Sequence, residues 1–565
     1  MKMTLWRTLF VSMVLLLLTG LATQPVFADE GDPPARVARL SLVQGKVSFQ
    51  PAGETQWSEV SVNRTVSTGD RLYADEQSRA ELEVGPYAVR LSRTTDLTVA
   101  NLNDQLMQLG LGQGSIRVTV YELPANNSVE IDTPNGALTL LRAGSYRVDT
   151  SADGSATQVT VNAGSLEVTG GGVTQAVQSG QAVHLTGTES IQVSFVSPPQ
   201  PDEFDNWCAG RDRRIEKYSS GEYVSRSVPG SEDLDEYGRW RNDPEYGPVW
   251  YPNNIPPGWV PYRQGRWAWV EPWGWTWVEA EPWGFVPFHY GRWAHLGPLW
   301  VWVPGPVVVG PVYAPALVAF VGGPGFSLGT GVGLQAWFPL GPREAFVPWY
   351  HYGPTYLREV NVTNVRNVTN ITTFTNIRYV NREGATTAVS SEVFRGGLLV
   401  GARAVQLTPE QISRAQVVPH PEVTPAAHAV FGGRAMVAPP VRAEKFGATA
   451  TGPRGLPTIT RTAPPTGGTK PVPTGMGHFG PPATPNRVIA KNPPPERNVP
   501  FLSREPAMSA HPGRPLEPQQ IENLRKGKPA GPMQDKEAIS HAAKAPREPA
   551  KTKSAPKEEL HEQKH

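Results

Sequence analysis

Short runs in which apolar and polar residues alternate recur between residues 36 and 196. They lie at residues 46–49, 79–84, 115–120, 158–161 and 165–168. A period of two buries one face of a β-strand and leaves the other face in water. Turn residues separate the runs, as at Asp153-Gly154, and no long segment shows helical periodicity. We therefore predict a mostly β protein in which residues 36–196 form an antiparallel β-sandwich or roll.

A tryptophan-rich repeat follows this β domain. Twelve of the 17 tryptophans fall between Trp240 and Trp302. Gly-Arg-Trp occurs at 238–240, 265–267 and 291–293, and Gly-x-x-Trp follows at 247–250, 274–277 and 297–300. Aromatic-Val-Pro-aromatic segments lie between the units at 259–262 and 285–288. We predict one β-hairpin per unit, with proline-broken turns between them, in a small Trp/Gly/Pro-rich β domain at residues 236–380.

The first residues have the layout of a secretory signal peptide. Basic Lys2 and Arg7 precede an apolar run at residues 9–18, and residues 26–28 form a small-x-small exit. The run is short for a bilayer span, which needs about 20 residues. We therefore predict a signal peptide at residues 1–28, cleaved after Ala28, with an uncleaved anchor as the alternative.

The net charge of +1 hides an uneven distribution. Residues 441–565 contain 20 Lys and Arg against 11 Asp and Glu, so they carry +9 and residues 1–440 carry −8. Pro, Gly, Ala, Lys and Thr dominate this last segment, which therefore has little apolar surface to offset its ordering entropy. We predict that residues 441–565 form a disordered, Pro-rich, basic tail. Residues 197–235 are expected to be a linker, and residues 381–440 a mixed linker.

Short motifs in the first β domain occur in a characteristic order. They are Thr68-Gly69-Asp70-Arg71-Leu72, a strand ending at Gly85, Thr133-Pro134-Asn135-Gly136, Ala143-Gly144-Ser145-Tyr146-Arg147-Val148, Val161-Asn162-Ala163-Gly164-Ser165-Leu166-Glu167-Val168 and Ser179-Gly180-Gln181-Ala182-Val183. This order resembles the FecR-type periplasmic domain. The family's founding members span the membrane and couple a siderophore receptor to a sigma factor. Since no cytoplasmic segment precedes the apolar run, we expect only the extracytoplasmic β module to carry over.

The tryptophan-rich repeat resembles an uncharacterised Trp/Gly/Pro-rich family of exported bacterial proteins. Members of that family are often placed directly after a FecR-type domain, as here. The segment from Trp337 to Tyr350 is similar to the most specific signature of the family. The resemblance covers residues 236–380, and it implies an envelope location without an assigned activity.

Several local patterns match catalytic motifs without their structural context. Residues 561–565 match the zinc-protease pattern H-E-x-x-H, but they end the predicted tail, where no cleft can form. Residues 325–329 match G-x-S-x-G, but no helix follows the serine. Glu271 and Glu281 precede the same Pro-Trp-Gly tripeptide, which indicates repeat geometry. The histidines His289, His295 and His351 fit no standard metal spacing, and Cys208 is expected to be an incidental thiol. We predict no catalytic residue, no metal site and no cofactor, and hence no enzyme.

The tryptophans allow two interpretations. As core residues, they would bury large areas and stack across strands. As binding residues, exposed rings would stack on sugars, and the arginines of the Gly-Arg-Trp copies could stack on the rings in turn. The candidate binding aromatics are Trp267, Trp273, Trp275, Trp277, Trp283 and Trp293. We favour core packing, with surface binding as the alternative.

These features favour a non-enzymatic interaction or scaffolding protein of a Gram-negative cell envelope, in the periplasm, at the outer membrane or outside it. Its β modules would contact envelope polysaccharide, peptidoglycan or proteins, and its basic tail would contact an anionic surface. A FecR-like extracytoplasmic sensor or regulator is the alternative, followed by a hydrolase built on Ser327 or the glutamates. Nucleic acid is not an expected partner, because acidic residues dilute the charge of the tail.

Overall fold

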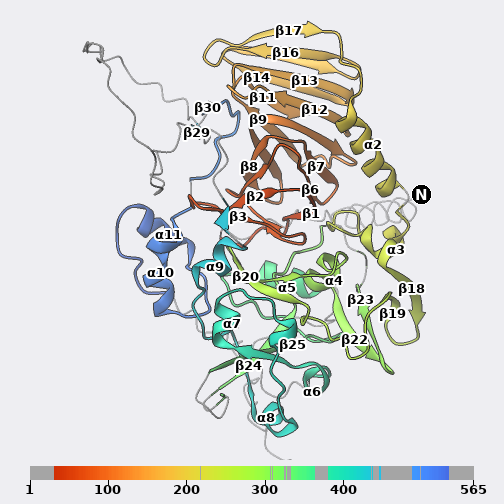
Figure 1. Ribbon diagram of the computed structural model, residues 1–565, viewed down its shortest axis with the longest axis vertical. Helices are drawn as coiled ribbons and strands as arrows, with labels where there is room; N and C mark the ends of the chain where they lie inside the picture. Colours follow the sequence, from red (N-terminus) through yellow and green to blue (C-terminus); the bar gives the residue numbers. More distant parts are fainter. Residues whose placement is uncertain are drawn as a thin grey trace, which may run out of the picture.

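The structure is a computed structural model in which two β-rich units are stacked along the long axis (Figure 1). It describes residues 31–216, 218–305, 307, 310–323, 326–327, 333–362, 379–433, 435–436, 445–446, 487–496 and 498–533. The predicted signal peptide and the H-E-x-x-H pattern lie outside these residues. The prediction of a mostly β protein is confirmed. Among the helices of the described ranges, none is long and apolar enough to span a membrane.

The first unit is a roll of two packed sheets. One sheet contains, in spatial order, β4 (Thr65–Val66), β1 (Ala38–Gln44), β6 (Arg79–Val84), β7 (Tyr87–Leu91), β9 (Leu106–Val120), β12 (Gly144–Thr150), β13 (Ala156–Ala163), β16 (Ala182–Thr186) and β17 (Gln192–Val196). The other contains β3 (Trp57–Glu59), β2 (Val47–Gln50), β5 (Arg71–Ala74), β8 (Thr95–Leu102), β9, β10 (Ser128–Thr133), β11 (Gly136–Leu140), β14 (Ser165–Gly170) and β15 (Val173–Gln178). Among these pairs, β9 and β10 run parallel and the others antiparallel, which agrees with the alternation in the sequence.

The long strand β9 joins the two sheets. Its first half pairs with β8 and β10, and its second half pairs with β7 and β12. Gly114 lies at the crossing with a φ of +87°, and a Cβ there would lie 2.5 Å from Cα of Thr95. Only glycine fits such a position. The apolar faces of both sheets then meet in one core, in which Leu109 and Val118 are fully buried.

The predicted linker at residues 197–235 contains a helix that packs on the roll. Helix α2 (Glu203–Glu216) lies beside β6, β7, β9 and β12 (Figure 1). Arg90 donates to Glu81 at 2.6 Å and to Asp212 of α2 at 2.7 Å, and Arg211 of α2 donates to the same Glu81. These two guanidinium groups hold the pKa of the Glu81 carboxyl at about 2. The helix is therefore fixed to the sheet by charge-assisted hydrogen bonds.

The second unit consists of small sheets and short helices. The first sheet has the strand order β18 (Gly238–Asp243), β19 (Gly247–Pro252), β23 (Leu299–Val303) and β22 (Arg292–Leu296). The second is the pair of β20 (Gly265–Val270) and β21 (Gly274–Glu279). The third has the order β26 (Thr387–Ser390), β25 (Leu334–Pro339), β24 (Val318–Gly322) and β27 (Gln416–Val418). The helices are α3 (Asp233–Tyr237), α4 (Phe285–His289), α5 (Pro354–Val362), α6 (Arg382–Ala385), α7 (Ser391–Arg395), α8 (Pro409–Arg414) and α9 (Ala427–Phe431), with 3-10 turns at Ser220–Glu222 and Gly401–Arg403. The predicted mixed linker at 381–440 thus supplies two strands of the third sheet. The predicted turn at 285–288 begins the short helix α4.

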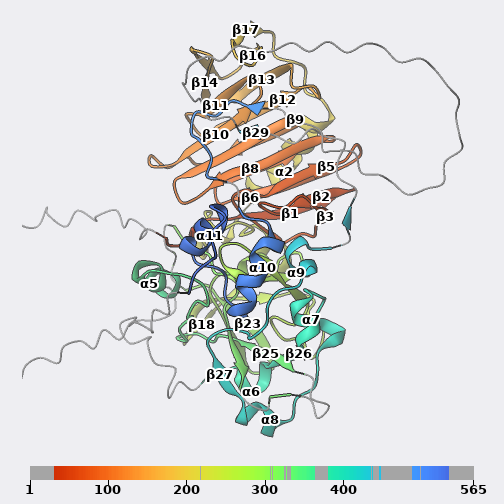
Figure 2. The same ribbon diagram turned by 90° about the vertical axis from the view of Figure 1, so that its left-hand side faces the viewer.

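The chain returns to the roll after the second unit. Strand β28 (Ala435–Met436) pairs with β3, and β30 (Arg487–Val488), which pairs with β29 (Lys445–Phe446), is followed by a bridge from Ile489 to Thr133. Helices α10 (Phe501–Ala510) and α11 (Pro518–Arg525) then lie across the junction of the two units (Figure 2). The prediction of disorder is therefore wrong for residues 498–533, while residues 534–565 of the predicted tail lie outside the described residues. This segment is ordered because it packs against the second unit, where Phe501 and Met508 are buried in the core.

A buried histidine links this fold to a measurable pH dependence. His289 lies beside the Tyr313 ring, its Nδ1 lies 2.8 Å from the Ala314 carbonyl oxygen, and burial lowers its pKa to about 3. In the unfolded chain the imidazole takes up a proton near pH 6.5, whereas the folded protein does not until about pH 3. As the pH is lowered from 6.5 towards about 3, the free energy of unfolding should therefore fall by up to about 1.4 kcal/mol for each pH unit because of His289 alone.

The variant His289→Asn tests this expectation, because asparagine keeps a donor for the Ala314 carbonyl and cannot titrate. Urea unfolding between pH 4 and pH 7 should show a flatter dependence of stability on pH in the variant. Curves that run parallel in the two proteins would contradict the assignment of this dependence to His289.

Candidate functional site

Each Gly-Arg-Trp copy opens a β-hairpin, as predicted. The cross-strand tryptophan pairs are Trp240–Trp250, Trp267–Trp277 and Trp293–Trp302. The sequence pattern Gly-x-x-Trp places Trp300 in the third pair, but Trp300 lies opposite His295 instead. In the first two hairpins the motif glycine, Gly247 or Gly274, is the first paired residue of the second strand, whereas Gly297 lies in the turn between Leu296 and Leu299, so Trp300 comes too early to face Trp293.

The glycine of each copy leaves room for the second tryptophan of its hairpin. A Cβ on Gly238 would lie 2.1 Å from Cε2 of Trp250. A Cβ on Gly265 would lie 2.7 Å from Cζ2 of Trp277, and Gly291 shows the same relation to its own tryptophan. Contacts below 3 Å exceed what close packing allows. The repeat is therefore a packing motif, in which glycine on one strand receives an indole from the next.

The six candidate binding aromatics are all in the core of the second unit. Their exposed fractions are 1% for Trp267, 0% for Trp273, Trp275 and Trp277, 3% for Trp283 and 1% for Trp293. They contact one another and neighbouring rings in edge-to-face or tilted arrangements, as Trp267 does edge to face with Trp277 at 5.4 Å between centroids. A ring that stacks on a sugar needs a free face, and these rings have none. Their burial supports the core-packing interpretation over the exposed row.

The three arginines of the repeat occupy three different environments. Arg239 is exposed, and its guanidinium lies 5.8 Å from the Tyr251 ring centre. Arg292 is buried, where it donates to the carbonyl oxygens of Gly291 and Glu344 at 2.8 and 3.0 Å. Arg266 is half-buried and lines a pocket at the junction of the two units. The same motif position thus becomes a surface residue, a buried anchor and a pocket residue.

Direct hydrogen bonds hold the two units together around this pocket. Asn63 of the roll donates to the Glu279 and Glu281 carbonyl oxygens at 3.1 and 2.6 Å, and Arg39 donates to Pro282 at 2.7 Å. Arg39 also pairs with Asp233 at 2.5 Å, and both side chains are buried. The two units are therefore joined by a buried ion pair, and removal of either partner would be strongly destabilising.

The junction pocket has a volume of about 480 Å³, which is enough for a small organic ligand. Its walls come from residues 59–62 of the roll, from Arg266 of β20 and residues 278–280 at the end of β21, and from residues 397–399, 403, 428 and 433. Valine, leucine and alanine side chains form much of the wall, and Leu399 is 57% exposed. The polar groups are those of Ser61, Arg266, Arg403 and His428, together with the carboxyls of Glu59 and Glu279.

The charges at this pocket are unbalanced. Arg266 donates to Ser61 Oγ at 3.3 Å, and within the described residues neither Arg266 nor Arg403 forms an ion pair. Burial raises the pKa of the Glu279 carboxyl to about 8, so this group is mostly uncharged at neutral pH. Burial also lowers the pKa of Arg266. The pocket therefore combines cationic groups with a single exposed carboxylate, that of Glu59.

The residues that match catalytic motifs form no reactive cluster in the described structure. Ser327 forms an isolated β-bridge with Gly333. Glu271 accepts from the Trp269 indole and from Arg504, which makes it a structural ion-pair partner. Burial raises the pKa of the Cys208 thiol to about 12, so the thiol stays protonated. Within the described ranges, no three His, Cys, Asp or Glu side chains are placed to share a metal ion.

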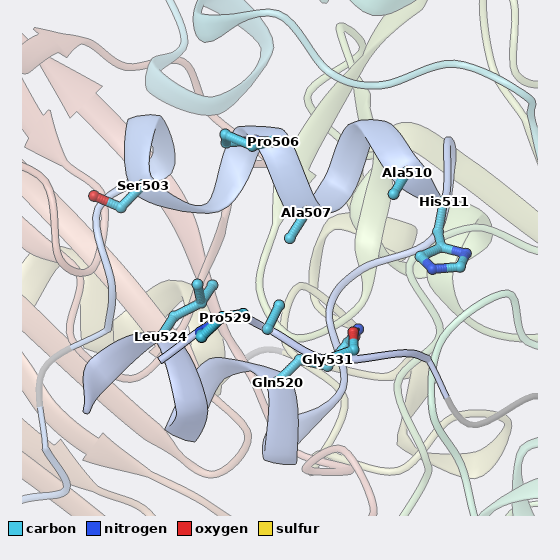
Figure 3. A pocket seen from close by; sticks show the side chains of 10 residues that line it. Ser503, Pro506, Ala507, Ala510, His511, Gln520, Leu524, Pro529 and Gly531 are labelled. Atoms are coloured by element: carbon cyan, nitrogen blue, oxygen red, sulfur yellow. The ribbon is translucent and has the colours of Figure 1, made fainter. Parts of the chain in front are cut away.

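A second pocket, of about 320 Å³, lies between α10 and α11 (Figure 3). Ala507 of α10 points into the space between the two helices, Leu524 of α11 lies on the opposite side of it, and His511 lies at one end. All of its lining residues belong to the C-terminal segment, in the region that the composition predicts to be disordered. It carries no charged lining residue and connects no two units, so the junction pocket is the better candidate site.

The family comparison matches part of the second unit. Residues 231–344 match the model of a family of unknown function, DUF6600. This match agrees in part with the resemblance of residues 236–380 to an uncharacterised Trp/Gly/Pro-rich family, and it covers the beginning of the 337–350 segment. The FecR-type resemblance of the roll has no such support and stays a prediction. No curated protein matches the chain.

Among solved structures, two crystal structures of a candidate anti-sigma factor from Parabacteroides distasonis are similar to parts of the chain. The first is 11% identical, with a TM-score of 0.20, over 22% of this chain and 60% of that one. The second is 12% identical, with a TM-score of 0.21, over 33% of this chain and 99% of that one. In the first structure the chain thus spans less than two thirds of the length of its relative. TM-scores at this level do not establish a common fold.

Proposed function

We propose that this protein is a non-enzymatic scaffolding protein that is exported to the bacterial cell envelope. Its roll and its tryptophan-rich unit act as one body, and the junction pocket is where that body binds an envelope component. The observation that carries the proposal is the junction itself. Buried bonds such as Arg39–Asp233 fix the two units to each other and leave an open pocket between them.

The chemistry of the described residues supports binding more than catalysis. The aromatic rings of the second unit are used for packing, and Glu271 is used in an ion pair. Enzymatic sites instead bring a nucleophile, a base and an orienting group within hydrogen-bond distance. Envelope polysaccharide, peptidoglycan and envelope proteins are the expected partners, and the basic C-terminal segment adds attraction to anionic surfaces.

The proposal is tested by crosslinking in intact cells that produce the full-length protein, followed by fractionation and mass spectrometry. We expect the protein in the envelope fraction, with crosslinks to envelope polymers or proteins. Leu399→Asp, at the pocket, should lower the yield of crosslinks. Leu502→Asp is the matched control, because Leu502 is 72% exposed on α10 and lies away from the pocket.

Recovery of the protein from the cytosol would contradict the proposal. Equal crosslinking by the wild type and by Leu399→Asp would show that the junction pocket is not where the envelope component binds. Selective recovery of a membrane receptor or of a sigma-factor regulator would favour the sensor alternative over a scaffold.

A further inference from the structure

A further arginine, Arg64, is buried near the junction pocket without lining it. Arg64 of the roll is 2% exposed and donates to the Val430 carbonyl oxygen at 3.3 Å. Its Nε and Nη1 atoms are buried without a hydrogen-bond partner in the described structure. Gly432 is close to Arg64, because a Cβ there would be 4.0 Å from Nη1 of Arg64. The neighbouring Gly433 lines the pocket itself.

The charges of Arg64 and Arg266 oppose each other. Burial and the charge of Arg266 together lower the pKa of Arg64 to about 10. Asp70 is the carboxyl that acts on Arg64, but the two form no ion pair within the described residues, and burial raises the pKa of Asp70 to about 6. Buried guanidinium groups normally lie against carboxylates or phosphates, because an uncompensated buried charge is costly. Arg90 follows that rule, with Glu81 at 2.6 Å, whereas the buried Arg292 donates to the carbonyl oxygens of Gly291 and Glu344.

We infer that the junction pocket binds an oxyanion, a carboxylate or a phosphate, attached to an aliphatic body. The oxyanion would accept hydrogen bonds from Arg266 and Arg403, which lack an acidic partner in the described structure. Arginine presents a planar fork of donors that matches both kinds of oxyanion. The aliphatic body would contact Val60, Val278 and Leu398, which line the same pocket.

This inference deepens the proposed function by naming the chemistry of the bound component, and it rests on that function only for the envelope location. The two can fail separately. Binding to a purified ligand is measured without cells, whereas the crosslinking experiment does not depend on an oxyanion.

The test is calorimetric titration of the full-length protein with octanoate, octyl phosphate and octanol. The three probes share one aliphatic chain and differ in the head group. We expect at least one of the two anions to bind about tenfold or more tightly than neutral octanol. The tighter of the two anions then distinguishes a carboxylate source from a phosphate source.

Arg266→Gln should weaken binding of the preferred anion by about tenfold or more. Arg239→Gln is the matched control, since Arg239 holds the same position in the first Gly-Arg-Trp copy and lies outside the pocket. Arg403→Gln provides a second pocket variant at an exposed position. The melting temperature of ligand-free Arg266→Gln should not fall, because the substitution relieves repulsion with Arg64. A purely structural arginine would lower that temperature when replaced.

Three results would overturn the inference. Octanol binding as tightly as both anions would show that charge is not recognised. Unchanged anion binding in Arg266→Gln and in Arg403→Gln would place the anion elsewhere. Absence of binding by all three probes would remove the site.

Discussion

Gly265→Ala is expected to destabilise the protein by about 3 kcal/mol or more, because its methyl group has no space. The new Cβ would lie 2.4 Å from the Val278 carbonyl oxygen and 2.7 Å from Cζ2 of Trp277. Neither can give way easily. The carbonyl belongs to the backbone of β21, and the Trp277 ring is fully buried against Trp267 and Trp337. Strain therefore spreads into the aromatic core.

Urea unfolding followed by tryptophan fluorescence measures this loss, since the core tryptophans report the second unit directly. Gly384→Ala in helix α6 is the matched control. A Cβ at Gly384 meets nothing within 4 Å, and alanine is a better helix former by about 1 kcal/mol. We expect the control to be as stable as the wild type or slightly more so. Equal stability of the two variants would mean that the glycine of Gly-Arg-Trp is not required by packing.

The hairpins of the second unit could be predicted because their signals are local. Gly265 marks the start of strand β20, and the turn before Gly274 marks the start of its partner β21. The two strands form the expected hairpin. The third register could not be predicted from motif spacing. Trp300 follows Trp293 by seven residues, whereas the paired tryptophans of the first two copies are ten residues apart, so Trp300 comes too early and Trp302 takes its place opposite Trp293. A repeat in sequence is thus not a guarantee of a repeat in register.

The junction pocket could not be predicted, because its walls come from segments that are far apart along the chain. Residues 59–62 and residue 428 are separated by more than half of the sequence, yet both line it. The only local signal was the arginine of Gly-Arg-Trp. It occurs in all three copies, and the sequence does not show that the copy at Arg266 is the one that faces a cavity. The environments of Arg239 and Arg292 differ from that of Arg266 only through the folds around them.

The C-terminal segment shows the limit of composition as a guide to order. Residues 498–533 are rich in proline and charge, which predicts disorder for an isolated chain. The prediction considers only the apolar surface within the segment, but the segment is ordered by packing against apolar surface of the second unit. Phe501 and Met508 of α10 are each 1% exposed, and they pack into the core of the second unit.

Charge complementarity adds to this packing. Arg504 of α10 is 2% exposed and lies between Glu54 of the roll and Glu271 of the second unit. A single guanidinium therefore connects three parts of the chain that are distant in sequence. Glu54 also accepts from the Phe501 backbone N–H at 2.7 Å, at the start of the same helix.

Arg504→Ala should therefore release α10 and α11 from the junction. Truncation leaves the carboxylates of Glu54 and Glu271 without their cation in a mostly buried site, which costs about 3–5 kcal/mol. The local unfolding of residues 501–525 should become much easier than that of the roll, so amide hydrogen exchange should accelerate in that segment. Exchange in β9 should stay slow, because the core of the roll makes no use of Arg504.

Arg525→Ala is the matched control for Arg504→Ala. Arg525 pairs with Glu496 and Glu522 at 3.2 and 2.5 Å, but its side chain is 30% exposed, so removing its partly solvated pairs should cost about 1 kcal/mol or less. Combining Arg504→Ala with Glu271→Gln should recover part of the protection of α10, because one unpaired carboxylate is then removed. Equal exchange of residues 501–525 in the wild type and in Arg504→Ala would show that apolar packing of Phe501 and Met508 holds the helix without the ion pairs.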